Sequence, residues 1–251
     1  MSSPFPAFPI CQITFPSSPL INAALAYSKE HTDACTVNHT LRSAAFSLLL
    51  MRKLPPFAAV DDIDVEAVVL ANILHDLGWA TTKSLLSPDK RFEIDGANLA
   101  RDLLKSAAGE NSAGWDKHRV QLIWDAIALH TTPSIAQHKE PEVSAVSLGI
   151  FADFVGPNIP IPGNPISVDE YKEIVTAFPR LGFKDHLVEI MCGLCREKPD
   201  TTFDNFVSDF GKSFGLDGKG TGKEDFKKLC EEKSLSNMLM GGLEACEQWE
   251  S

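Results

Sequence analysis

The stretch NILHDLGW, residues 72–79, places a histidine and an aspartate side by side at the end of an apolar helical run. Apolar side chains recur at helical spacing over residues 62–77, Asp61 or Asp62 suits the start of this helix, and Gly78 suits its end. The apolar neighbours predict that His75 and Asp76 are buried, and buried polar groups need partners. A metal ion would be a partner for both side chains.

The same helical spacing continues through most of the chain, with no strand alternation and no internal repeat. We therefore predict an all-α fold, a helical bundle. The Pro- and Gly-rich stretch 156–167 is predicted to be a surface loop. Besides residues 62–77, the predicted helices cover residues 20–30, 36–53, 94–107, 115–131, 141–155, 168–177, 183–197, 203–213 and 224–234.

The composition is that of an ordinary globular protein, with 251 residues of which 44% are hydrophobic. The formal net charge of −11 disfavours nucleic acid and anionic membranes as partners, because both are polyanions. No apolar run is long enough to span a membrane. The six cysteines are scattered, and the N-terminus lacks the basic residues of a secretory signal, so a cytoplasmic location is expected.

Three parts are predicted along the chain. Residues 1–19 form an extended, Pro-rich arm, residues 20–214 form the main domain, and residues 215–251 form a Gly-rich linker with a helical extension. The segment 215–225 does not have the spacing of a phosphate-binding loop. The arm and the terminal helix are both candidates for contacts in a homo-oligomer.

Further polar residues of the same kind lie at the apolar faces of other predicted helices. They are His39, His130 and Asp153, so that the chain reads H…HD…H…D. A single helical histidine on an apolar face is more often a hydrogen-bonded core residue than a metal ligand. The ordered combination is stronger evidence than any one of its members.

With these residues the chain resembles the HD-domain superfamily, whose all-helical metalloenzymes have the ordered pattern H…HD…D. Within it the sequence looks most like the fungal cyanamide hydratases. NHTLR (38–42), NILHDLG (72–78), FEIDGA (92–97) and IVTAFPRLGF (174–183) are similar to stretches of that family in the same order. The last of these stretches is expected to lie outside the metal site.

The resemblance implies that His39, His75, Asp76 and Asp153 bind one divalent metal ion. Zinc is the first choice, and Fe²⁺ and Mn²⁺ are alternatives, because two imidazoles and two carboxylates suit several ions. His130 is either a catalytic acid or a residue that orients a ligand, and it is also a candidate for the substrate pocket.

Other residues around this pattern have supporting roles. Trp79 is expected to line the substrate pocket or to be part of the core. Arg42 and Glu93 are candidates for contacts with ligand residues, but each could instead close a structural ion pair, and for Arg42 the structural role is favoured.

Two chemistries fit this resemblance. Many HD proteins hydrolyse phosphate esters of nucleotides and have HDxGK, but Trp79 occupies the lysine position here, and residues 91–97 lack the histidine of a second metal site. These two differences favour hydration of a small nitrile-type substrate, cyanamide to urea, by a metal-bound hydroxide in which Asp76 and His130 handle protons, and phosphate-ester hydrolysis is the alternative. Trp79 also leaves open another small nitrile or an isonitrile as the substrate, and a catalytically silent binding protein remains a third reading.

Overall fold

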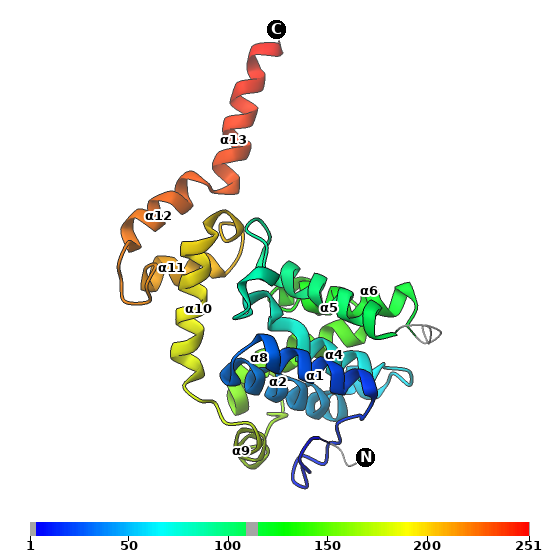
Figure 1. Cartoon of the computed structure of the whole chain (residues 1–251). Helices are drawn as coiled ribbons and strands as arrows, with labels where there is room; N and C mark the ends of the chain where they lie inside the picture. The colour runs from blue at the N-terminus through cyan, green and yellow to red at the C-terminus, as the bar shows by residue number, and fades with distance from the viewer. Residues whose placement is uncertain (1–3, 109–114, 251) are drawn as a thin grey trace. The chain divides into compact units, whose positions relative to one another are not determined.

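The computed structural model describes residues 4–108 and 115–250, and within these ranges it is helical without any named strand. The only β-type pairing among them is an isolated bridge between Phe8 and Ile13. The predicted all-α fold is therefore confirmed. The chain divides into two compact units (Figure 1). The N-terminal unit comprises Met1–Ser87 and Phe92–Leu181, and the C-terminal unit comprises Pro88–Arg91 and Gly182–Ser251.

The N-terminal unit is a bundle in which long helices surround an apolar centre. Its elements are α1 (Pro19–His31), α2 (Ala34–Lys53), α3 (Pro55–Ala58), α4 (Val65–Leu74), the 3-10 helices η1 (His75–Trp79) and η2 (Lys83–Leu85), α5 (Phe92–Ala108), α6 (Lys117–Ala128), α7 (Pro133–Ala136), α8 (Pro141–Val155), the 3-10 helix η4 (Gly156–Asn158) and α9 (Val168–Ala177).

Helix α4 lies in the middle of this unit, and every residue from Ala67 to Leu74 is buried. It contacts α1, α2, α6 and α8, so apolar side chains on all of its faces are covered. Its N-cap is Asp64, whose carboxylate accepts a hydrogen bond from the backbone N–H of Ala67. The predicted caps Asp61 and Asp62 are wrong, because the helix begins later than the pattern indicated.

The helix predicted over residues 62–77 changes its form at the histidine–aspartate pair. The α-helix ends at Leu74, and His75–Trp79 continue as the 3-10 helix η1. Helix α5 packs against η1 at very short range, since a Cβ atom on Gly78 would lie 1.7 Å from the carbonyl oxygen of Phe92. Only glycine fits at this crossing, and the close contact fixes the turn that presents His75 and Asp76.

Helices α2 and α8 make the most extensive contact of the unit, and they also approach closely. A Cβ atom on Gly149 of α8 would lie 2.0 Å from the Ser47 hydroxyl oxygen of α2. The N-cap of α2 is Asp33, which accepts from the N–H of Thr36. This pair of helices holds His39 and Asp153 on facing surfaces.

The described N-terminal residues, which belong to the predicted extended arm, pack onto the unit. Phe8 and Phe15 are buried, and their rings pack against each other and against Phe178. The backbone N–H groups of Ile10 and Cys11 donate to the carboxylate of Glu173. Residues 156–167 were predicted to be a surface loop, but they also pack onto the unit, because Ile159 and Ile166 are buried in the core.

The C-terminal unit contains α10 (Phe183–Glu197), η5 (Pro199–Thr201), α11 (Val207–Phe214), α12 (Lys223–Glu232), α13 (Leu235–Cys246) and η6 (Glu247–Trp249). The unit begins at residue 182, whereas the sequence placed a boundary at 214. Cys192 and Cys195 are buried free thiols of α10, in keeping with the core packing predicted for them.

The predicted linker before α12 is a hydrogen-bonded loop. Leu216 N–H donates to the carbonyl oxygen of Thr221, and the Asp217 carboxylate accepts from the N–H groups of Lys219 and Thr221. A Cβ atom on Gly215 would lie 2.6 Å from the carbonyl carbon of Gly220. The glycines of this segment therefore allow a compact turn and not a loose connection.

Across the described parts of the chain, no helix is both long enough and apolar enough to cross a lipid bilayer.

Candidate metal centre

Three polar side chains converge in the core of the N-terminal unit. His39 comes from the middle of α2, and His75 and Asp76 come from the first residues of η1. The Nε2 atoms of the two histidines are 3.3 Å apart, and Asp76 Oδ2 lies 3.0 Å from His75 Nε2 and 3.4 Å from His39 Nε2. All three side chains are buried. One ligand atom from each could therefore reach the same ion.

The other ring nitrogen of each histidine is held by an oxygen. His75 Nδ1 lies 2.7 Å from the carbonyl oxygen of Asn72, and His39 Nδ1 lies 2.7 Å from Asp153 Oδ2. A carbonyl or carboxylate oxygen can only accept, so in each ring Nδ1 carries the proton and donates it. Both Nε2 atoms then face the centre as lone pairs, which is how ligating histidines are usually oriented.

Asp76 is a buried carboxylate whose oxygens both lack a hydrogen-bond partner among the described residues. Its nearest polar neighbours are the two Nε2 atoms, which offer lone pairs and no protons. An uncompensated carboxylate is costly in an apolar interior. The Asp76 carboxylate therefore calls for a cation, and the two-nitrogen, one-oxygen set suits a borderline divalent metal. The residues present therefore fit the implied metal ion.

His130 lies at the edge of this group, immediately after α6. Its Nδ1 donates to the carbonyl oxygen of Ile127 at 2.6 Å, and its Nε2 lies 3.9 Å from Asp76 Oδ1. Burial, together with the electrostatic effect of the neighbouring His75 ring, lowers the pKa of His130 to about 4. The ring is neutral at neutral pH, with a third lone pair directed at the centre, so it is not a standing proton donor.

Asp153 is the fourth predicted ligand, and the structure places it on the far side of the His39 ring. Its Oδ2 contacts His39 Nδ1, while Arg42 donates from Nε to Oδ1 at 2.7 Å and from Nη2 to Oδ2 at 2.9 Å. Both carboxylate oxygens are therefore engaged. Asp153 orients His39 in this arrangement, and direct ligation, which would require it to leave Arg42, stays a prediction.

Charge and burial compete at this side of the centre. Burial raises the pKa of Asp153, but hydrogen bonds and charges of His39 and Arg42 outweigh it and leave the pKa at about 2. Burial lowers the pKa of His39, although Asp153 and Asp76 pull it upward. Asp153 is thus a stable anion that holds His39 in the orientation needed for ligation.

The aromatic wall of the centre is formed by a residue that the sequence did not single out. The predicted pocket residue Trp79 is buried and stacks on Phe92, with ring centroids 5.4 Å apart. Phe92 in turn meets the His130 ring edge-on at 5.7 Å. Glu93 is buried and accepts a hydrogen bond from the hydroxyl of Thr131, the residue after His130. Trp79 and Glu93 therefore act through Phe92 and Thr131.

The stretch Ala177–Arg180 (AFPR) was expected to lie outside the site, and this expectation is wrong. Arg42 Nη1 donates to the carbonyl oxygens of Phe178 and Pro179 at 3.0 and 3.1 Å. Arg180 Nη2 donates to both the backbone and the side-chain oxygens of Asp153. The segment closes around Asp153, a long-range contact that helical periodicity does not reveal.

The burial of Asp153 was expected because Phe151 and Phe154 flank it. Asp153 is buried, but Phe151 and Phe154 are 41% and 46% exposed. Asp153 points inward because it lies on the face of α8 that meets α2, whereas its neighbours lie on other faces. The Phe154 ring still contacts His39 edge-on at 5.4 Å.

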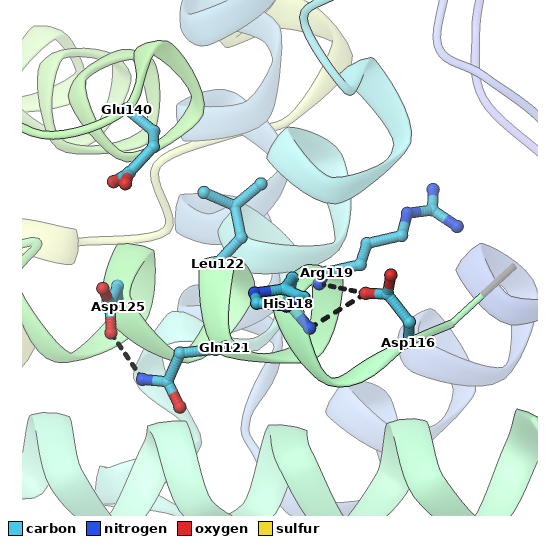
Figure 2. A pocket seen from close by; sticks show the side chains of 7 residues that line it. All are labelled: Asp116, His118, Arg119, Gln121, Leu122, Asp125 and Glu140. Carbon is cyan, nitrogen blue, oxygen red and sulfur yellow. Dashed lines mark hydrogen bonds between the residues drawn. The ribbon is translucent and has the colours of Figure 1, made fainter.

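A surface pocket of about 460 Å³ lies elsewhere in this unit, along α6 (Figure 2). Asp116, the N-cap of α6, accepts hydrogen bonds from the backbone N–H groups of His118 and Arg119. The side-chain amide of Gln121 donates a hydrogen bond to the Asp125 carboxylate. None of its described lining residues belongs to the predicted site. The pocket is therefore separate from the buried centre.

Comparisons with known proteins agree with this geometry. Residues 36–154, a little less than half of the chain, match the family model of the HD domain. The search of curated proteins gave no match. The matched segment begins in α2 and ends at Phe154, so it contains His39, His75, Asp76, His130 and Asp153. HD domains are generally those of metal-dependent hydrolases that bind divalent metals. The match supports the HD-domain superfamily as the family of this chain.

Proposed function

We propose that the protein is a metal-dependent enzyme that adds water to a small nitrile-type substrate, converting cyanamide to urea. The observation that carries the metal dependence is the Asp76 carboxylate, buried without a hydrogen-bond donor beside the lone pairs of His39 and His75. A divalent ion bound by these residues would lower the pKa of a coordinated water and so supply a nucleophile near neutral pH.

The overall reaction needs only water and the nitrile. In cyanamide, N≡C–NH₂, the water oxygen bonds to the nitrile carbon while one π bond of the C≡N group breaks. One water proton goes to the nitrile nitrogen, and transfer of the second from oxygen to nitrogen gives urea. No oxidant, reductant or leaving group takes part, so the site must position the water and move two protons.

The proposal assigns that proton movement to Asp76 and His130. Asp76 has no competing donor among the described residues, and its Oδ1 lies 3.9 Å from His130 Nε2. His130 is neutral because burial lowers its pKa to about 4, so it first accepts a proton and then returns it to the nitrile nitrogen. Phe92 and Trp79 wall this side of the centre. Such surroundings favour a small neutral substrate.

The charges near the centre argue against a phosphate ester. The cationic side chains beside His39 are Arg42 and Arg180, and both are engaged with Asp153. Trp79 occupies the position at which phosphohydrolases of this superfamily often have a lysine. The net charge of −11 also gives no long-range attraction to nucleotides, nucleic acids or anionic membranes. We propose a cytoplasmic enzyme of small molecules, in keeping with the free thiols of every described cysteine.

The test is release of urea from cyanamide by protein loaded with Zn²⁺, Fe²⁺ or Mn²⁺ in turn. We expect about one metal per chain, and we expect Asp76→Asn to lose both metal and activity. His130→Gln should keep the metal and lose about 10²–10⁴-fold in kcat, the usual size of a general acid–base contribution. His118→Ala, an exposed histidine of the surface pocket, is the matched control and should behave as the wild type.

Two outcomes would contradict the proposal. Metal-loaded, folded protein that releases phosphate from a nucleotide panel but forms no urea would instead support the phosphohydrolase alternative. If the protein turns over other small nitriles or an isonitrile but not cyanamide, the hydration reaction would stand and cyanamide would be wrong as the substrate.

A further inference from the structure

The terminal helix α13 (Leu235–Cys246) is apolar and uncovered. It has no buried residue, and its large apolar side chains are more than half exposed. These exposed fractions are 58% for Leu235, 64% for Met238, 55% for Leu239, 56% for Met240 and 64% for Leu243. Figure 1 shows α13 as the red helix that follows α12. Single exposed apolar residues are common, but this helix of twelve residues has five, and all of them except Met240 lie on one side.

A helix of this length is marginal by itself in water, because nucleation is costly and most helical stability comes from packing of an apolar face. Residues 235–246 include a single charged side chain, Glu244, and two adjacent glycines, Gly241 and Gly242, which weaken a helix further. A cap of Ser234 on the N–H of Asn237 is its local support. A partner surface is therefore expected to stabilise α13.

The apolar side chains lie mainly on one side of the helix. At 100° per residue, Leu235, Leu239, Gly242 and Cys246 form a central stripe, with Met238 and Leu243 on its two edges. The opposite side holds Asn237, Met240 and Glu244. The stripe has large residues in its N-terminal half and small ones toward its C-terminal end, with open space around Gly242.

We propose that α13 pairs in antiparallel orientation with α13 of a second copy of this chain. Antiparallel pairing places Leu239 of each copy over Gly242 of the other, and Leu235 over Cys246. Large side chains then fill the space above small ones, as close packing requires. Parallel pairing would set Gly242 against Gly242 and leave a gap at the centre of the contact.

Charge favours the same orientation. The C-terminal end of the helix carries Glu244, Glu247 and Glu250, whereas the segment before the helix carries Lys233 together with Glu231 and Glu232. A parallel pair would bring six carboxylates together. An antiparallel pair separates the two acidic C-terminal ends and places the positive end of each helix dipole near the acidic end of the partner. The pattern of large and small residues thus fits another copy of the helix, and an anionic membrane does not suit its acidic end.

The first experiment measures the mass of the full-length protein by light scattering and sedimentation over a range of concentrations. The wild type should be a dimer, and Leu239→Glu should be a monomer, because two buried carboxylates would face the partner. Met240→Glu is the matched control on the opposite side and should remain a dimer. Both positions are exposed in the single chain, so neither variant threatens the fold.

The second experiment tests the orientation with cysteines. Cys246 is the only exposed cysteine among the described ones. In the antiparallel pair the two Cys246 residues are about 16 Å apart, at about 1.5 Å of rise per residue, so mild oxidation should not link the wild type. Leu235→Cys places a thiol opposite the partner's Cys246 and should give a covalent dimer, which Cys246→Ser in the same chain should abolish.

The remaining outcomes overturn the proposal. A monomeric wild type at tens of micromolar, or a dimer that persists in Leu239→Glu, would exclude pairing through this face. A Cys246–Cys246 disulfide in the wild type would establish the parallel arrangement. Binding of monomeric wild-type protein to uncharged phosphatidylcholine vesicles, lost in Leu239→Glu, would identify a lipid surface as the occupant.

Discussion

Two buried aspartates stand on either side of His39, and they differ in what surrounds them. Asp153 accepts hydrogen bonds from His39, Arg42 and Arg180, so that both of its carboxylate oxygens are satisfied. Asp76 is buried to a similar extent, but neither of its oxygens has a hydrogen-bond partner in the described structure. Asp153 is satisfied by hydrogen bonds from protein side chains alone. Asp76 lacks a cationic partner, which the described residues do not supply.

Asp153 supports the centre, whereas Asp76 is the aspartate that a metal ion would bind. A buried ion pair with all of its hydrogen bonds made keeps its geometry, and here it fixes the ring of His39. A buried carboxylate among lone pairs is destabilising until a cation arrives. His39 contacts both aspartates. Asp153 therefore orients the imidazole ring, and Asp76 would bind the cation together with that ring. Perturbing each aspartate and its partners should therefore give effects of opposite kinds.

The largest effect is expected from Arg42→Met. The side chain is fully buried, and its loss leaves Asp153 without its two-bond partner. Removing one member of a buried ion pair typically costs about 3–5 kcal/mol in the free energy of unfolding. Urea unfolding followed by circular dichroism measures this loss. A cost below about 1 kcal/mol would mean that Asp153 does not depend on Arg42, and a double variant with Asp153→Asn should recover part of the loss.

Adding a metal ion should raise the stability of the wild type by about 2.7 kcal/mol when the free ion is at 100 times its Kd. The gain arises because the ion binds the folded centre and removes the unpaired charge of Asp76. Thermal unfolding with and without Zn²⁺, and after chelation, measures it. Asp76→Asn should show no gain, and without metal it should be at least as stable as the wild type. A less stable metal-free variant would show that Asp76 already has a partner.

Acid should weaken the satisfied aspartate over a defined range of pH. The pKa of Asp153 is lowered from 3.8 to about 2, so its contribution is present above pH 3.8 and is lost as the pH falls toward 2. The difference between these pKa values corresponds to roughly 2 kcal/mol. The gap in unfolding free energy between wild type and Asp153→Asn should narrow by that amount. If the difference in unfolding free energy between wild type and Asp153→Asn stayed constant across this pH range, the ion pair of Asp153 would not contribute to stability.

The sequence predicted the helices well because their apolar faces repeat along the chain. Residues 141–155, 168–177 and 183–197 were predicted with the bounds that α8, α9 and α10 have. The end of α4 was harder, since its change to a 3-10 helix is linked to the close approach of Phe92 to Gly78. That contact joins two different helices, and the periodicity within each helix does not reveal it. Local pattern therefore predicted the elements and not the turn that presents the site.

The candidate site followed a similar division. His39, His75 and Asp76 were predicted as a group and lie together. The arrangement of Asp153 could not be predicted, because it depends on which side of the His39 ring α8 approaches and on Arg42 and Arg180 reaching the same carboxylate. Phe92 was quoted within FEIDGA without a role, and its place beside His130 follows from the packing of α5 on η1.

The smallest effect is expected from Arg180→Met. Arg180 contacts the same aspartate as Arg42, but its side chain is 29% exposed and it also donates to the Tyr171 hydroxyl. Solvent screens such a pair, so the loss in unfolding free energy should be about 1 kcal/mol, well below that of Arg42→Met. Urea unfolding of the two variants side by side measures the ratio. If Arg180→Met were the more damaging change, the AFPR segment and not Arg42 would be the principal support of Asp153, and the exposed edge of the centre would matter more than its buried side.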